Sequence, residues 1–229
     1  MPEIPAAAST IMPADGLPGW SELPYTFTFP PDWSDDLAQR GVDMVRLRQT
    51  PLQTGQWYRD GDSGNIVCRG DGGHTWLRYD RVLRDYEAHV EWRFRKLDRP
   101  ALYNSGVFVR NDPALNIMTQ IETRYDRTTT GFFFTKTFAF GQKTAIYGFY
   151  PSPSGELRPF DPQVPDNPTI VHPPGQWNSY DIRVVGREAR LWTNGAFSSM
   201  FELALDEGYF GLEAERYWIE FRNLRLDAL

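Results

Sequence analysis

The sequence predicts an all-β protein: an antiparallel β-sandwich or jelly roll, preceded by an irregular N-terminal arm. From residue 56 onward, apolar and polar residues alternate with a period of two in ten or more short segments, which is typical of strands with one buried face. Helical periodicity is almost absent, and turn-forming residues separate the segments. A chain of 229 residues is long enough for one large sandwich domain.

The first 35 residues form the expected arm. They are rich in Pro, Ala and Ser, and the prolines at positions 13, 18, 24, 30 and 31 exclude a long helix. Aromatic side chains, among them Trp20 and Tyr25, would anchor the arm to the domain. We therefore expect the single jelly-roll domain to occupy residues 36–229.

The expected strands follow one another along that domain. They cover residues 56–58, 65–68, 86–94, 106–110, 117–125, 145–150, 179–185, 190–193, 208–214 and 218–226. The alternation is clearest between Tyr86 and Phe94, where every second residue is apolar. Asn194-Gly195 indicates a tight hairpin between two strands.

Two segments interrupt this pattern. Residues 151–174 contain eight prolines and predict a long loop over one rim of the sandwich. Residues 130–143 contain five phenylalanines, an apolar run that needs a partner. Three interpretations of this run remain open: it closes the core, forms the face of a homodimer, or lines a pocket for an apolar ligand.

Composition excludes several classes of protein. The formal net charge of -6 argues against a nucleic-acid partner, because such proteins usually carry a basic surface. No apolar run approaches the ~20 residues that span a membrane. Cys68 is the single cysteine, which excludes an intrachain disulfide and a zinc site made of thiolates. The N-terminus lacks the basic and apolar regions of a signal peptide, so the expected location is cytoplasmic.

The ordered set of motifs after residue 55 resembles a known family. These motifs are Gly73-His74-Thr75-Trp76-Leu77-Arg78, Asp85-Tyr86-Glu87, Glu91-Trp92-Arg93, Asn104-Ser105-Gly106-Val107-Phe108-Val109-Arg110, Gln120-Ile121, Ala145-Ile146-Tyr147-Gly148, Gly175-Gln176-Trp177-Asn178-Ser179-Tyr180, Thr193-Asn194-Gly195, Gly208-Tyr209-Phe210-Gly211-Leu212 and Ile219-Glu220-Phe221-Arg222-Asn223-Leu224. Their order and spacing are similar to the DUF1080 family, also called the 3-keto-disaccharide hydrolase domain. The resemblance implies a concanavalin A-like, LamG-type jelly roll that acts on glycosides oxidised to a 3-ketone.

One departure from the family concerns its acidic residues. The family usually has an acid two positions before the Gln of its fourth motif block and an Asp three positions after it. This chain has Met118 and Thr123 there. The resemblance therefore implies the fold more directly than it implies the family's catalytic residues.

The chemistry implied by the resemblance is a base-assisted elimination. A 3-ketone acidifies the proton on C2, so a base can remove it while another group stabilises the enolate, and the substituent on C1 then leaves. Glu122 is the expected base, because it shares a strand face with Gln120 and could replace the acid missing at Met118. Arg110 is the expected oxyanion partner, and His89, beside Glu91, is the expected proton-transfer residue.

Other residues on the same strand faces or rims would bind the substrate. They are Gln120, Tyr147, Asn104, Arg124, His74 and Phe108. A solvated outer face with surface ion pairs is the alternative for the charged members of this set. No cofactor is required, and the three histidines form no zinc motif, although calcium bound by Asp60, Asp62 and Asp71 stays open.

Three functions follow from these observations. The first is an enzyme of the glycoside hydrolase or lyase kind that acts on 3-keto sugars. The second is a non-catalytic carbohydrate-binding module, which the residues at Met118 and Thr123 favour. The third is a biosynthetic cyclase or isomerase for an apolar small molecule, which the phenylalanine-rich segment favours. The expected partner is in each case a carbohydrate or another small molecule.

Overall fold

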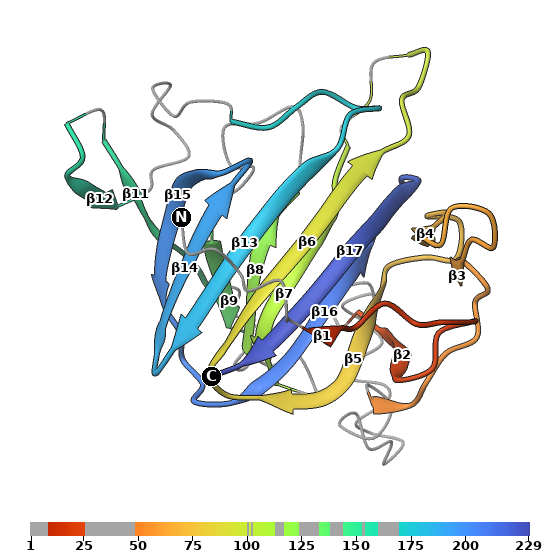
Figure 1. Ribbon diagram of the computed structural model, residues 1–229, viewed down its shortest axis with the longest axis horizontal. Coiled ribbons are helices and arrows are strands. Elements are labelled where there is room, and N and C mark those ends of the chain that lie inside the picture. Colours follow the sequence, from red (N-terminus) through yellow and green to blue (C-terminus); the bar gives the residue numbers. More distant parts are fainter. Residues whose placement is uncertain are drawn as a thin grey trace.

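The fold is a sandwich of two antiparallel sheets, one of ten strands and one of seven, packed face to face (Figure 1). The computed structural model describes residues 9–25, 49–99, 101, 103–112, 117–123, 133–137, 144–152, 154–159 and 170–229. This arrangement confirms the all-β jelly-roll prediction. Among these residues, no helix is long and apolar enough to cross a membrane.

The ten-stranded sheet contains the long central strands that run across Figure 1. Its order is β12 (Leu157–Pro159), β11 (Phe149–Pro151), β15 (Ala196–Glu202), β14 (Glu188–Thr193), β13 (Asn178–Val185), β6 (Tyr86–Phe94), β17 (Ile219–Ala228), β4 (Ile66–Cys68) and β3 (Trp57–Arg59), and β1 (Ser9–Thr10) pairs with β17. β14 and β15 form the hairpin predicted at Asn194-Gly195. Both turn residues have positive φ angles, 50° and 81°, as a type I′ turn requires.

Part of the seven-stranded sheet lies behind these strands in Figure 1, and the rest lies to the right of β17. Its order is β10 (Thr144–Tyr147), β9 (Phe133–Thr137), β8 (Ile117–Glu122), β7 (Gly106–Asn111), β16 (Gly208–Ala214), β5 (Thr75–Leu83) and β2 (Trp20–Pro24). β9 belongs to the phenylalanine-rich segment and pairs with β8 and β10, so part of this segment extends the sheet. The side chains of residues 130–143 lie outside the described residues.

The core fills the space between the two sheets. On β6, Ala88, Val90, Trp92 and Phe94 are buried, while the residues between them are only partly buried. The opposing sheet contributes inward side chains at every second position, among them Leu212 on β16. Burying each large apolar side chain contributes about 1.5–3 kcal/mol. These alternating positions therefore fix which face of each strand points outward.

The N-terminal arm is more regular than the sequence predicts. Between residues 9 and 25 it adds β1 to the ten-stranded sheet and β2 to the seven-stranded sheet. Trp20 is buried in the core, and its Nε1 donates a hydrogen bond to the Ile11 carbonyl at 3.2 Å. Strands this short, the second ending at Pro24, show no alternation that sequence analysis can detect. The rest of the expected arm lies outside the described residues.

Candidate functional site

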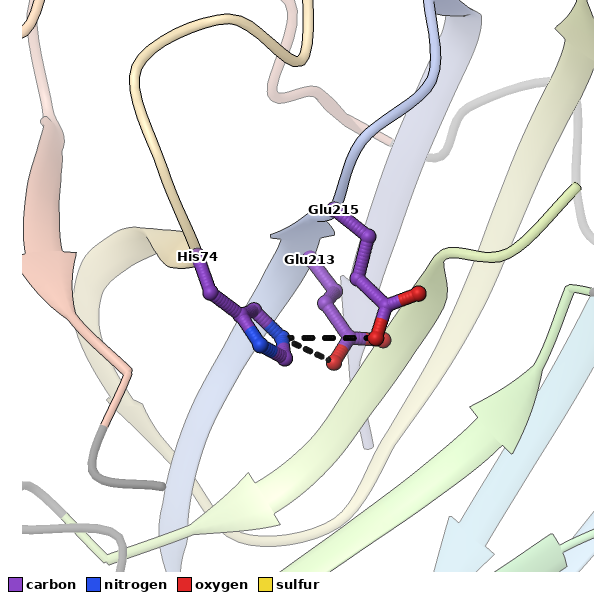
Figure 2. A group of neighbouring side chains, drawn as sticks. All are labelled: His74, Glu213 and Glu215. Carbon is purple, nitrogen blue, oxygen red and sulfur yellow. Dashed lines mark hydrogen bonds and ion pairs between the residues drawn. The ribbon is translucent and has the colours of Figure 1, made fainter. Parts of the chain in front are cut away.

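A polar cluster occupies the outer face of the seven-stranded sheet, where β5 begins and β16 ends (Figure 2). Phe210, Leu212 and Ala214 of β16 point into the core, so Glu213 must point outward. Glu213 pairs with Trp76 of β5. If this pairing is continued by one residue, His74 lies opposite Glu215. Both are then on the same outer face as Glu213.

The geometry of this cluster centres on one buried carboxylate. His74 Nε2 lies 2.8 Å from Glu213 Oε1, and Gln120 Nε2 donates to Glu213 Oε2 at 2.5 Å. Glu215 Oε1 lies 3.9 Å from His74 Nε2, as Figure 2 shows. The Glu213 side chain is 2% exposed, whereas that of His74 is 17% exposed. Glu213 therefore positions a partly accessible imidazole on one side and a buried amide on the other.

A small apolar cluster lies beside these polar groups on the same outer face. It consists of Leu23, Tyr25, Trp76 and Phe108, and it is separate from the main core. The Tyr25 ring stacks on the His74 ring, with centroids 3.7 Å apart and an interplanar angle of 11°. The residues around β2 and β5 therefore restrict the orientation of the imidazole.

Two glycines leave room for the side chains of this face. A Cβ at Gly106 would stand 2.1 Å from Gln120 Nε2, and one at Gly211 would stand 2.6 Å from Trp76 Cε3. Real Cβ atoms do not approach other atoms so closely. The absence of a side chain at each position thus lets Gln120 and Trp76 lie across the sheet.

Several buried polar atoms near the cluster have no hydrogen-bond partner within the described residues. They are Gln120 Oε1, Asn104 Oδ1 and Trp76 Nε1. Asn104 precedes Ser105, whose hydroxyl donates to the Glu213 main-chain carbonyl at 2.8 Å. Buried polar atoms are nearly always satisfied in folded proteins. These atoms are therefore open to a partner that lies outside the described residues.

The structure brings three of the residues predicted from the sequence to this face, and Asn104 lies beside it. His74, Gln120 and Phe108 lie in or against the cluster. The backbone register pairs Glu122 with Gly106, and the β7–β16 register, continued by one residue, pairs Gly106 with Glu213. Glu122 therefore belongs to the same cross-strand row as Glu213. Its side chain lies outside what the structure describes.

Two further candidates cannot be placed in the same way. Tyr147 ends β10, which lies two strands beyond β8 in the sheet, but its side chain is outside the described set. Arg124 lies outside the described residues altogether. Their predicted contacts with substrate remain predictions.

Arg110, the expected oxyanion partner, lies among protein groups that use its hydrogen-bond donors. Its side chain is fully buried, and it ion-pairs with Asp85 at 2.9 Å. The guanidinium also donates to the main-chain carbonyls of Arg84, Gly186 and Leu205. These contacts hold loops together, so the guanidinium has a structural role.

His89, the expected proton-transfer residue, lies on the outer face of the other sheet. Its Nδ1 is 2.6 Å from Asp181 Oδ1, and its Nε2 is 3.6 Å from Glu91 Oε1. Burial raises the pKa of Glu91, but hydrogen bonds from Asn223 and Arg222 outweigh this and hold the pKa below its ordinary value. His89 thus belongs to an ion-pair network that the core separates from Glu213, and the two cannot share one site.

Potential metal ligands gather at the candidate site and not where the sequence suggested. Asp60 accepts hydrogen bonds from Ser63, and Asp71 pairs with Arg69. In the described part of the chain, the group close enough to hold one ion is His74, Glu213 and Glu215, whose ligand atoms lie within 4.8 Å of one another. Sequence analysis missed both glutamates, although the alternation of β16 would have placed Glu213 on the outer face.

The ten-stranded sheet also carries a depression on its outer face. This cavity of about 480 Å³ is lined by Arg183, Val185, Glu188, Arg190 and Trp192. Arg183 pairs with Glu87, and Arg190 pairs with Glu188. The cavity is therefore a charged surface with one large aromatic side chain, and the core separates it from the His74 cluster.

The fold places the protein in the jelly-roll class of β-sandwiches, an architecture that lectin domains share. A polar cluster lies on one of its outer faces. Comparison with known proteins gives the particular family. Residues 43–227 match the 3-keto-alpha-glucoside-1,2-lyase-like domain, and the chain belongs to this family. No curated protein matches the chain.

Solved structures share the fold at low sequence identity. A proposed glycosyl hydrolase from Parabacteroides distasonis is 14% identical, with 96% of this chain and 92% of that chain covered and a TM-score of 0.58. The carbohydrate-binding module CBM66 from Bacillus subtilis is 12% identical, with 75% of this chain and 91% of that chain covered and a TM-score of 0.51. These similarities support the sandwich fold.

Proposed function

We propose that this protein is a carbohydrate-active enzyme that cleaves 3-keto glycosides by elimination, on the outer face of the seven-stranded sheet. The observation that carries the proposal is the buried Glu213 held between His74 and Gln120, in a chain of the 3-keto-alpha-glucoside-1,2-lyase-like family. Groups that recognise a polar ring are present there, because Gln120 Oε1 and Asn104 Oδ1 are unsatisfied acceptors among the described residues. Sugar hydroxyls would donate to them.

The reaction requires a proton acceptor next to the sugar. Removal of the C2 proton gives an enolate, and its collapse forms the C1–C2 double bond while the C1–O bond breaks and the leaving oxygen takes a proton. Glu122 remains our candidate for the base, since its row on the sheet also contains Glu213 and the intervening residue is Gly106. Glu213 would act as a positioning residue that fixes His74 and Gln120.

Replacing Glu213 with Gln tests this function. The substitution keeps the shape of the side chain but removes the negative charge that His74 and Gln120 share, so turnover of a 3-keto glucoside should fall by about 10²-fold or more. Release of a chromogenic leaving alcohol measures the rate. The matched control is Glu220→Gln, because Glu220 pairs with Arg93 on the other sheet. Full turnover by Glu213→Gln would contradict the proposed site.

A carbohydrate-binding module is the alternative. The cavity beside Trp192 favours it, because an indole ring flanked by Arg183 and Arg190 offers both a stacking surface and hydrogen-bond donors. The fold is also that of the module CBM66. Binding of glycans without turnover of any 3-keto glycoside, and loss of that binding in Trp192→Ala, would favour this alternative.

A further inference from the structure

We propose that His74, Glu213 and Glu215 bind one divalent transition-metal ion. The three side chains come from the start of β5 and the end of β16, and their ligand atoms face one another in Figure 2. The binding site itself follows from the geometry. The role of the ion in catalysis, considered below, rests on the proposed function.

The distances suit a single ion. His74 Nε2 is 2.8 Å from Glu213 Oε1 and 3.9 Å from Glu215 Oε1, and the whole set lies within 4.8 Å. Nitrogen and carboxylate ligands lie about 2.0–2.2 Å from such an ion, so two of them on opposite sides stand about 4.2 Å apart. Movements of a few tenths of an ångström, about the scale of ordinary side-chain adjustment, would complete the coordination.

Gln120 provides an independent indication of a ligand. The residue is 2% exposed, and its Nε2 is bound to Glu213. The other amide atom, Oε1, is buried and has no hydrogen-bond partner in the described part of the chain. An amide oxygen cannot donate, so what is missing beside it is a donor or a cation. The Oε1 atom is therefore open to a ligand bound at this face.

The charge of the buried carboxylate supports the same conclusion. Glu213 is 2% exposed, and no Arg or Lys among the described residues forms an ion pair with it. Buried charges in proteins are generally paired or coordinate a metal. A divalent ion would balance the charge of Glu213 and leave His74 neutral, as a metal ligand must be.

The ligand types select the kind of ion. Calcium usually takes six to eight oxygen ligands, so the imidazole of His74 argues against it. One nitrogen combined with carboxylate oxygens suits ions such as Mn²⁺ or Zn²⁺. Tyr25 stacks on the His74 ring and restricts its rotation, which is the kind of support that metal-bound histidines usually receive.

The bound ion would explain how this site stabilises an enolate without Arg110. In a 3-keto sugar the ketone oxygen and the neighbouring hydroxyl on C2 can bind one ion together. The ion then polarises the carbonyl and stabilises the negative charge that forms when the C2 proton leaves. Glu122 is not one of the proposed ligands and stays available as the base.

Metal titration tests the site directly. Full-length protein is freed of metal with EDTA, dialysed and titrated with MnCl₂ by calorimetry. We expect one Mn²⁺ per chain and a rise in Tm, because a ligand that binds only the folded state stabilises it. His74→Ala and Glu215→Gln should each weaken Mn²⁺ binding by about 10-fold or more. Circular dichroism would verify that the variants are folded.

His89→Ala is the matched control. His89 also lies between two carboxylates, those of Asp181 and Glu91, but on the other sheet. The substitution His89→Ala should leave the affinity for Mn²⁺ unchanged. The proposal would be overturned if the wild-type protein bound neither Mn²⁺ nor Zn²⁺ at millimolar concentration. Equal weakening in His74→Ala and His89→Ala would also overturn it, because binding would then be nonspecific.

Activity separates this inference from the proposed function. Loss of 3-keto glucoside turnover after EDTA treatment, with recovery on adding Mn²⁺, would support both. Stoichiometric Mn²⁺ binding without any turnover would support the metal site and reject the proposed function. Undiminished turnover by the metal-free protein would support the function and overturn the catalytic role of the ion.

Discussion

Individual side chains in this protein take their roles from the partners that surround them. His74 and His89 each lie beside two carboxylates, yet their settings differ. Beside His89, the Glu91 carboxylate is paired with Arg222, so the local charge is balanced by protein groups. Beside His74, the fully buried Glu213 is bonded to Gln120. Among the described residues, no Arg or Lys forms an ion pair with Glu213, and this difference makes His74 the histidine to expect at a functional site.

Arg110 gives a prediction at this scale. Arg110→Met should lower the free energy of unfolding by about 3–5 kcal/mol, because it leaves the Asp85 carboxylate and three carbonyls without their shared donor. Urea denaturation measures the loss, and turnover per folded molecule should stay unchanged. A variant of normal stability without turnover would instead restore the role that the sequence suggested. Arg110→Lys, which keeps the charge but not the fork of donors, should be intermediate.

At the scale of the strands, alternation predicted some elements well and missed others. β6 matches its predicted bounds because every second residue is buried. β5 was missed, since four of its last five residues are only partly buried or exposed and the pattern fades. The alternation of residues within its own strand was enough to assign Gln120 to an outer face. Its contact with Glu213, however, joins residues 93 positions apart, and only the pairing of β7 with β8 and β16 brings them together.

The contact between β7 and β8 at Gly106 and Gln120 gives a second prediction. Gly106→Ala should displace the Gln120 amide from Glu213, because the new Cβ would stand 2.1 Å from Gln120 Nε2. We expect turnover to fall about 10-fold and stability to fall by about 1–3 kcal/mol, the usual cost of overpacking. The control is Gly61→Ala, because a Cβ there meets no atom within 4 Å.

The mechanism of this effect is testable by combination. In a Gln120→Ala background the clash disappears, so adding Gly106→Ala should change turnover little further. Non-additivity of this kind identifies residues that act through a shared contact. Fully additive losses would mean that Gly106 matters for another reason.

The whole molecule has two outer faces with different chemistry. The N-terminal segment connects the two sheets, because β1 pairs with the ten-stranded sheet and β2 with the seven-stranded sheet. One outer face carries the His74 cluster and the other carries the network around Glu91. Since the apolar core lies between them, changes on one face should leave the other unaffected.

The pH dependence of stability tests this separation. The pKa of Glu91 in the folded protein lies below its ordinary value of 4.5, because the hydrogen bonds from Asn223 and Arg222 outweigh the effect of burial. Its ionised form is thus favoured by folding. The stabilisation is present above pH 4.5 and is lost as the pH falls through the lowered pKa. In Glu91→Gln this acid-dependent part of the stability should be missing.

The two stability curves should therefore differ at neutral pH and converge in acid. We expect Glu91→Gln to cost about 1 kcal/mol at neutral pH, a modest value because the group is partly exposed, and urea denaturation across the acid range measures it. Glu188→Gln, which removes an exposed partner of Arg190 on the same sheet, is the control and should change little. Turnover and Mn²⁺ binding at neutral pH should be normal in Glu91→Gln. If either is lost while the protein remains folded, the two faces are coupled, and the assignment of function to the His74 face alone is wrong.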